Sequence, residues 1–489
     1  MISVQNHQQL LSGNKIWIAL LLVCFITSCD LFRKAQDTEQ PADETEELSE
    51  IQGKKVYDPE TGKYVVVNEV ETPVDTIEWT VVDTEKVPPI ISDTSLPEAP
   101  VDIEPIDENP IEVIADKVLK DSYKVSMLLP FVKSRFNSAD ATINKNSLWA
   151  VKYYAGAQLA LDQLRAEGVN LDVEVMDTEG SDAVTRGLLP RLDSADLVIG
   201  PYRSSTARLI AAHTKVAQIP TVVPFSASSS ISADNPYLIQ VNPQFSSHVE
   251  KIVMDVYEKY DTSQVVLITK KSEADRFATF QDVLFQICND STARFKEFVI
   301  EEESLGLEET DLSEVIAENK KTVFIVPSWS DASFVSSVVR KLRVSKSPYA
   351  GITVYGMPQW RNYKNIEFNY YEDLDLHLTT SNFANENDPN VRLFRQRYFD
   401  KFGAIAGDEA YLGYDVMLYF GRMLHKNGAN FYQFFGNSGV PNEQLHTTFD
   451  FAPEYKMEDI LKEDNTKIQR FENQHLELIH FSGYHFVKY

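Results

Sequence analysis

The regular alternation of short apolar runs with longer amphipathic stretches, from Tyr123 onward, is the feature that most constrains the fold. Each apolar run is rich in Val, Ile and Leu and predicts a buried strand. The stretches between the runs carry apolar residues at helical spacing, as Leu148–Glu167 does. Strands that alternate with helices are typical of βαβ units in a mostly parallel sheet. The expected strands are Tyr123–Leu129, Leu171–Met176, Asp196–Ile199, Ile219–Val223, Gln264–Thr269, Phe295–Val299, Thr322–Val326 and Ile352–Tyr355.

The length of this region predicts two lobes. From residue 121 to the end the chain has roughly 370 residues, which is more than one core usually covers. The pattern breaks near Tyr237–Gln244. We therefore predict an α/β domain over 121–489 with two lobes, each a mostly parallel sheet flanked by helices. Ligands of such sheets bind beyond the carboxyl ends of the strands, so the expected site is the cleft between the lobes.

Residues 1–28 have the features of an export signal. Lys15 is followed by the apolar run Ile16–Ile26, which at roughly eleven residues is too short for a permanent membrane span of about 20. Ile26-Thr27-Ser28-Cys29 then resembles a lipobox, in which the cysteine is acylated and becomes the mature N-terminus. The alternative is an ordinary signal peptide with an incidental cysteine. We predict a lipid anchor at Cys29 and a place in the cell envelope, on the inner or outer membrane and facing the periplasm.

Residues 29–120 are predicted to be a tether between the lipid and the domain. From Asp30 to Ser122 the chain carries 25 acidic and 8 basic residues, within a net charge of −27 for the whole chain. Such a charged, proline-rich segment buries too little apolar surface to fold, so we expect most of it to be disordered. The exception is Lys55–Val65, which predicts a hairpin, alone or paired with Thr76–Val82. The acidity argues against binding to nucleic acid and against adsorption to anionic lipids.

Cysteine and histidine usage gives no sign of disulfides, metals or catalysis. Once Cys24 is removed with the signal and Cys29 is acylated, only Cys288 remains, so no intramolecular disulfide is expected. Cys288 lies in an apolar stretch and is predicted to be a buried core thiol. The nine histidines form no metal-ligand pattern, and no nucleophile elbow or phosphate-binding loop occurs. We therefore expect a binding protein with no enzymatic activity and no cofactor.

Four consecutive segments carry a resemblance to a known family. Asp196–Pro201 is a strand that ends in Gly-Pro, Tyr202–Ser205 is a polar loop, Gln218–Pro220 leads into the next strand, and Val223–Ser228 ends it. In this order and spacing they resemble the type I periplasmic binding proteins, specifically the branched-chain amino-acid-binding group. Further similar segments are Val125–Pro130, Ile352–Gly356, Phe394–Tyr398 and Gly413–Asp415.

The resemblance covers roughly Tyr123 to the end and implies how the chain is shared between the lobes. Lobe 1 is expected to contain about 121–243 and 380–435. Lobe 2 is expected to contain about 244–379 and 436–489. The chain would then cross between the lobes near residues 240, 380 and 435.

The expected ligand site combines residues that follow strands in both lobes. Ser204 begins a predicted helix, where free N–H groups and the helix dipole favour a carboxylate. The resemblance implies that Ser204, Ser226 and Ser228, with Ala227 between the last two, bind the ligand's anionic group from lobe 1. Each serine alone is also explained by helix capping or turn formation. The lobe 2 residues expected to close over the ligand are Arg276, Trp329, which suits a core position equally well, and Gln359.

One departure from the family bears on the ligand. Family members that bind amino acids usually place a carboxylate in lobe 2 to take the ligand's ammonium group. The segment Gly356–Trp360 has no carboxylate there. Asp275 and Asp331 are the candidates to replace it.

Two functions remain open. The first is a solute-binding protein that captures a small polar, amino-acid-like ligand and delivers it to a membrane permease. The second is a protein–protein module that regulates peptidoglycan synthesis through a cell-wall synthase, like the lipoprotein activators of penicillin-binding proteins. The serines of lobe 1 favour the first function, which is the main hypothesis. The long tether and the missing carboxylate favour the second.

Overall fold

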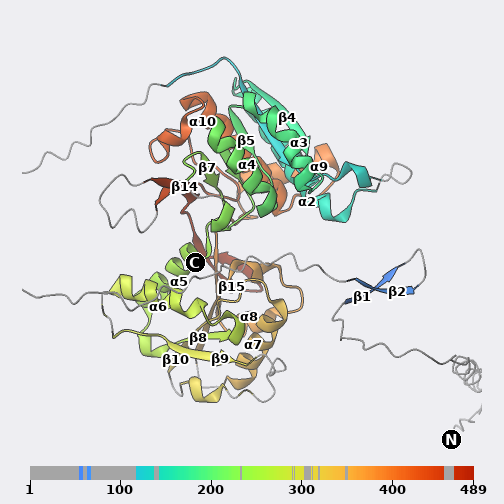
Figure 1. Ribbon diagram of the computed structural model, residues 1–489. Coiled ribbons are helices and arrows are strands. Elements are labelled where there is room, and N and C mark those ends of the chain that lie inside the picture. Colours follow the sequence, from blue (N-terminus) through green and yellow to red (C-terminus); the bar gives the residue numbers. More distant parts are fainter. Residues whose placement is uncertain are drawn as a thin grey trace, which may run out of the picture. The chain divides into compact units, whose positions relative to one another are not determined.

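The computed structural model describes residues 54–58, 63–67, 117–136, 142–231, 234–288, 290, 292–301, 310, 312–317, 320–346, 351–455 and 467–489. The predicted signal peptide, Cys29, Thr76–Val82 and most of the tether lie outside these ranges. The chain divides into two units, Met1–Asp107 and Glu108–Tyr489 (Figure 1). No helix within the described ranges is long and apolar enough to cross a membrane.

The first unit contains one described element, a two-stranded hairpin. Its strands β1 (Lys54–Asp58) and β2 (Lys63–Val67) pair antiparallel, with Val56 opposite Val65. The hairpin predicted over Lys55–Val65 is therefore confirmed.

The second unit contains two seven-stranded sheets, and the first of them defines lobe 1. Six neighbouring strands of this sheet are parallel, and β13 at one edge pairs antiparallel with β14. In sheet order the strands are β13 (Phe451–Tyr455), β14 (Ile468–Asn473), β7 (Leu238–Gln240), β6 (Thr221–Val223), β5 (Leu197–Ile199), β3 (Tyr123–Leu129) and β4 (Leu171–Asp177). The helices that flank it are α2 (Leu148–Ala166), α3 (Asp182–Leu188), α4 (Ser204–Ala217), α9 (Pro389–Phe402) and α10 (Asp408–Asn427).

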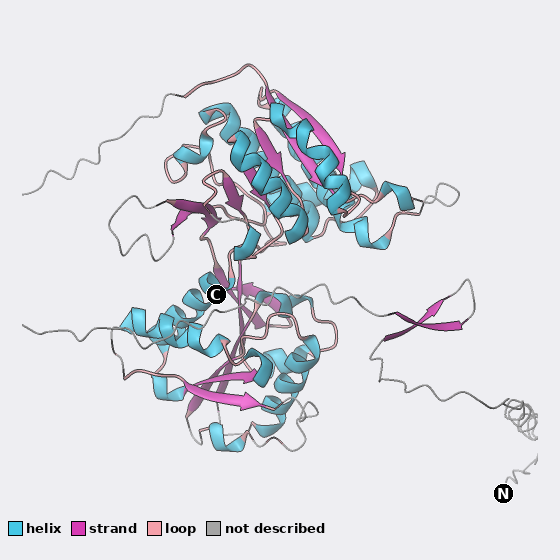
Figure 2. Cartoon of the chain, in the orientation of Figure 1, coloured by secondary structure: helices cyan, strands magenta, loops and turns pink. Residues whose placement is uncertain are grey.

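The second sheet defines lobe 2. Its first five strands in the chain are parallel, and the C-terminal strands β15 and β16 add antiparallel to its edge. In sheet order the strands are β16 (His485–Lys488), β15 (Glu477–Ser482), β12 (Leu376–Thr380), β11 (Gly351–Gly356), β10 (Lys321–Ile325), β8 (Val265–Lys270) and β9 (Lys296–Ile300). Figure 2 shows helices around this sheet, and they are α5 (Phe245–Lys259), α6 (Arg276–Cys288), α7 (Ala332–Ser345) and α8 (Phe368–Asp373).

The central strands form because their side chains are apolar on both faces. In β8, every residue from Val265 to Ile268 is 2% exposed or less, and β12 is buried along its whole length. Such runs suit parallel strands that are covered by helices on both sides. The predicted two-lobed α/β fold is confirmed.

The boundaries expected for the lobes differ from the structure at the C-terminal end. The sequence predicts all of 436–489 in lobe 2, whereas β13 and β14 belong to the lobe 1 sheet. Phe471 of β14 lies opposite Ile239 of β7, and it packs in the lobe 1 core. The last crossing between the lobes therefore lies between β14 and β15, after Asn473, and not near residue 435.

Cys288 also differs from its prediction. It ends α6 and packs against the lobe 2 core, but it is only partly buried. Its thiol lies 3.6 Å from the carbonyl oxygen of Asp290. The apolar run around Cys288 is a helix of which one face reaches the surface.

Candidate functional site

In lobe 1, the strand ends bring two of the predicted serines together. Ser204 is the first residue of α4, which follows β5, and Ser226 follows β6. Because β5 and β6 are parallel neighbours, their carboxyl ends lie at one edge of the sheet. The hydroxyl oxygens of Ser204 and Ser226 are 3.4 Å apart. The backbone N–H of Ser228 donates to the Ser226 hydroxyl at 3.3 Å, so Ala227 lies in a tight turn.

The N-terminus of α4 lies beside these hydroxyls. Arg203 is the N-cap residue, and its side chain makes no capping hydrogen bond. The first N–H groups of a helix have no partner within the helix, and the dipole gives that end a partial positive charge. This end of α4 therefore favours an anionic group.

A group of aromatic side chains lies next to the serines. Trp149, from the first turn of α2, is 4.5 Å from the ring centre of Tyr202 and 4.6 Å from that of Phe225. Tyr153 is buried behind them, 5.0 Å from Phe225. Tyr202 is 49% exposed. The edge of the lobe 1 sheet thus offers hydroxyl groups and an aromatic surface side by side.

In lobe 2, Arg276 and Trp329 both contact Phe245. The guanidinium of Arg276 lies 5.5 Å from the ring centre of Phe245, and the ring of Trp329 lies 6.1 Å from it. Trp329 also packs edge-to-face on His248 at 5.1 Å. Burial lowers the pKa of His248 to about 3, so the imidazole is neutral at physiological pH. Ser204, Ser226, Ala227 and Ser228 therefore form one group in lobe 1, and Arg276 and Trp329 form another in lobe 2.

The family model described as periplasmic binding protein matches residues 145–433, which is more than half of the chain. The chain belongs to the periplasmic binding protein family. The family implies an extracytoplasmic location and a binding role. No curated protein matches the chain.

Several solved structures share the fold. One is a branched-chain amino acid ABC transporter periplasmic ligand-binding protein from Burkholderia xenovorans, with a TM-score of 0.51 and 14% identity over 75% of this chain and 94% of that chain. Another is an ABC transporter substrate-binding protein from Desulfitobacterium hafniense in complex with Leu, with a TM-score of 0.50 and 11% identity over 75% of this chain and 100% of that chain. A third is full-length LpoA from Haemophilus influenzae, with a TM-score of 0.50 and 11% identity over 76% of this chain and 60% of that chain.

The carboxylates of lobe 2 that lie nearest the predicted residues are already occupied. Asp331 accepts a hydrogen bond from Lys270 at 2.8 Å and caps α7 through the N–H of Phe334 at 2.9 Å. Partial burial opposes its ionisation, but the bonds from Lys270 and the helix hold its pKa below the usual range. Glu273 pairs with Arg276 at 3.1 Å. The carboxylate of Asp331 is therefore already paired and is not available to a ligand's ammonium group.

The remaining predicted residues of lobe 2 are less clearly arranged. Asp275 is exposed and makes no ion pair with any described residue. Gln359 lies in the short helix after β11, and its side-chain oxygen is buried without a hydrogen-bond partner in the described structure. Arg276 donates to the carbonyl oxygen of Pro327 at 2.6 Å, which ties it to the end of β10.

Two features of the site are not predicted by the sequence. The aromatic group contains Tyr202 and Phe225, which lie inside the motif of the family, but Trp149 comes from a helix about 50 residues away. The second feature is a bridge between the lobes, because Arg361 of lobe 2 donates to Asp408 at the start of α10 at 2.6 Å. Spacing along the sequence carries no signal for either contact.

Proposed function

We propose that the chain is an extracytoplasmic solute-binding protein that holds a small carboxylate-bearing ligand at the serine edge of lobe 1. The observation that carries the proposal is the pair of hydroxyls of Ser204 and Ser226, 3.4 Å apart beside the uncapped start of α4. Two hydroxyl donors and the N–H groups of a helix suit a carboxylate. The aromatic surface of Trp149 and Tyr202 suits an apolar portion of the same ligand.

The ion pairs of lobe 2 narrow the class of ligand. Lys270 and Arg276 occupy the carboxylates of Asp331 and Glu273, so that of the described carboxylates beside Arg276 and Trp329 the exposed Asp275 is the one left for an ammonium group. A ligand without an ammonium group, such as a 2-oxo acid, then binds with nearly the same free energy as the matching amino acid. We therefore expect 4-methyl-2-oxopentanoate to bind at least as tightly as leucine.

Thermal unfolding of the purified chain tests the proposal. The panel contains leucine, 4-methyl-2-oxopentanoate, short peptides and muropeptides. A ligand at about 100 times its dissociation constant stabilises the fold by about 2.7 kcal/mol, so a hit raises the melting temperature by several degrees or less. The shift should disappear in the S204A/S226A variant and persist in S122A/S194A, which changes two exposed serines elsewhere. A panel that leaves the melting temperature of the wild type unchanged would count against a solute site.

A second function, the regulation of a cell-wall synthase, is favoured by a different observation. The fold is similar to that of LpoA, and the occupied carboxylates of lobe 2 make a poor amino-acid clamp. The test adds the purified chain to a class A penicillin-binding protein from the same cells and measures the rate of glycan polymerisation. A changed rate supports this function, and an unchanged rate together with a ligand hit supports the first.

We also propose that Cys29 anchors the mature chain to a membrane through its lipid. The support is the apolar run followed by Ile26-Thr27-Ser28-Cys29. Mass spectrometry of the mature protein should show an N-terminal peptide that starts at a diacylglyceryl-modified Cys29. The C29A variant should keep its first 28 residues. A wild-type chain cut elsewhere and free of lipid would refute the anchor.

A further inference from the structure

Helix α9 carries an unusual set of side chains for so acidic a chain. It contains three arginines and a lysine but a single acidic residue, Asp400, within a protein of net charge −27. Three large apolar side chains on it or just after it are exposed, namely Leu393 by 52%, Phe399 by 55% and Ile405 by 74%. Together with Arg392 and Arg397, these residues form what we call the α9 surface.

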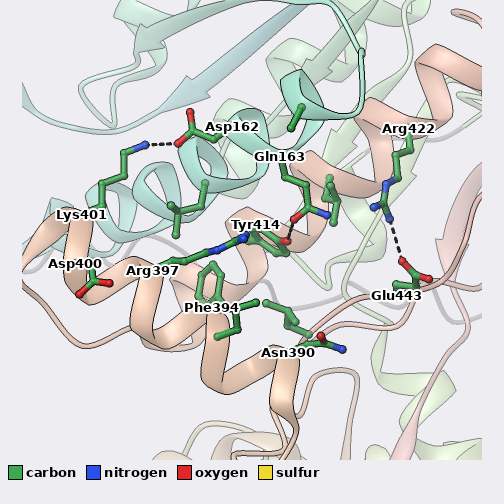
Figure 3. Close-up of a pocket in the computed structure, with 15 residues that line it drawn as sticks. Asp162, Gln163, Asn390, Phe394, Arg397, Asp400, Lys401, Tyr414, Arg422 and Glu443 are labelled. Atoms are coloured by element: carbon green, nitrogen blue, oxygen red, sulfur yellow. Dashed lines mark hydrogen bonds and ion pairs between the residues drawn. The ribbon is translucent and has the colours of Figure 1, made fainter.

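Two cavities flank the α9 surface. One has a volume of about 940 Å³ and lies between α9, α2 and α10. Leu393, Phe394 and Arg397 line it from α9, and Figure 3 shows Arg397 extending toward Tyr414. The other, of about 380 Å³, is lined by Arg392, Phe399 and Ile405 among others. Each cavity thus combines an arginine with exposed apolar side chains.

Three of the four acidic residues that line these cavities form ion pairs, and the fourth, Asp400, accepts a hydrogen bond from the side chain of Gln396 at 2.8 Å. Asp162 pairs with Lys401 at 2.6 Å, Glu443 with Arg422 at 3.7 Å, and Glu386 with Arg395 at 3.2 Å. By contrast, the guanidinium groups of Arg392 and Arg397 make no ion pair and no hydrogen bond with any residue that the structure describes. The α9 surface therefore has two uncompensated positive charges set among apolar groups.

We propose that the α9 surface is a docking site for an acidic, apolar segment of another protein. Arginine and large apolar side chains are typical of protein interfaces, and the two free guanidinium groups match carboxylates. A nucleic acid or an anionic membrane presents an extended array of negative charge, which the whole chain repels at a net charge of −27, whereas a short acidic segment meets only the local positive charges of the α9 surface. The α9 surface shares no residue with the serine edge of lobe 1. The docking proposal therefore does not depend on whether the protein binds a solute.

Binding of a defined peptide to the full-length chain tests the proposal. The probe is a fluorescent peptide built from glutamate, leucine and proline, and fluorescence anisotropy reports its affinity. We expect R392E/R397E to weaken binding at least about tenfold, because both charges are reversed. The matched control R186E/R340E reverses two exposed arginines on α3 and α7 and should bind as the wild type does. A probe with lysine in place of glutamate should not bind.

Three outcomes would overturn the proposal. Equal affinity of R392E/R397E and R186E/R340E would place binding elsewhere. Tighter binding of the probe after the tether acids are changed to amides would make the chain's own tether the occupant. Loss of self-association in R392E/R397E, measured by sedimentation, would make a second copy the occupant. Circular dichroism spectra that match the wild type would show that each variant folds.

Discussion

At the scale of single residues, Asp415 is a fully buried acidic side chain with a large pKa shift. It lies in α10 with no exposed surface, and its carboxylate accepts three backbone N–H bonds of 2.9 Å from Leu445, His446 and Thr447. Burial raises the pKa of Asp415 to about 6, although these bonds favour the charged form. Asp415 thereby holds the 445–447 loop against α10.

The raised pKa of Asp415 predicts a pH dependence of stability. The folded state binds the proton more tightly than the unfolded chain, so the free energy of unfolding falls as pH rises from about 4 to about 6, by up to about 3 kcal/mol. The D415N variant should be less stable overall, because its amide group faces N–H donors, but its stability should lose this slope. Urea unfolding at several pH values measures both effects. The exposed Asp172 gives the control D172N, and a D415N slope equal to that of D172N would contradict the expectation.

The serines of the site could be predicted from the sequence, but the side-chain contacts in lobe 2 could not. Ser204 and Ser226 could be predicted to meet because each follows a strand, and the carboxyl ends of neighbouring parallel strands share an edge. The partners of Asp331 could not be predicted. The bond from Lys270 joins the last residue of β8 to the N-cap residue of α7, 61 positions apart in the sequence.

At the scale of elements, the close contact of α2 with α10 organises lobe 1. A Cβ atom on Gly156 would lie 1.8 Å from the carbonyl oxygen of Ala410, and one on Gly413 would lie 2.0 Å from that of Tyr153. Only glycine at both positions lets the two backbones approach so closely. This close contact fixes the position of α10 against α2. It thereby fixes the position of Asp415 relative to the 445–447 loop.

Alanine substitutions at two helical glycines should therefore have opposite effects. G413A forces α2 and α10 apart and should lower the free energy of unfolding by about 3 kcal/mol. G187A, in α3, meets no atom within 4 Å and should raise it by about 0.5–1 kcal/mol, because alanine favours a helix. Urea denaturation measures both variants. A G413A chain as stable as the wild type would show that α10 can shift at no cost.

Strand β14 was not predicted from the sequence because it carries polar residues. Of the strands from β3 to β11, the sequence predicts all except β7, which has only three residues and lies where the pattern breaks near Tyr237–Gln244. Strand β14 instead buries Arg470 and Glu472, which pair at 3.2 Å, and the carboxylate of Glu472 also accepts the N–H of Gln244 at 2.8 Å. A buried strand whose polar groups find partners only in the folded chain has no apolar signature. The lobe boundary near residue 435 was misplaced for this reason.

At the scale of the whole molecule, the bridge between Arg361 and Asp408 links the lobes beyond the crossings of the chain. Arg361 donates to Asp408 at 2.6 Å and also to the carbonyl oxygen of Asn382 at 2.9 Å. Its side chain is 17% exposed. Burial opposes the ionisation of Asp408, yet His446 and Arg361 together hold its pKa well below the usual range. The bridge therefore stabilises the fold above the unfolded pKa of an aspartate, and this contribution is lost as pH falls.

A double-mutant cycle of R361A and D408A should measure this link. We expect a coupling energy of about 1 kcal/mol near neutral pH that shrinks with added salt and at acidic pH, the opposite pH trend to that of Asp415. The matched pair is Lys401 with Asp162, which has the same 2.6 Å separation but lies within lobe 1, and its cationic side chain is 39% exposed against 17% for Arg361. Its coupling should be smaller. If the protein captures a solute by moving its lobes, R361A should also change the ligand-induced shift in melting temperature, whereas K401A should leave it unchanged. A ligand shift that is equal in both variants would mean that the bridge stabilises the fold without governing how the lobes move.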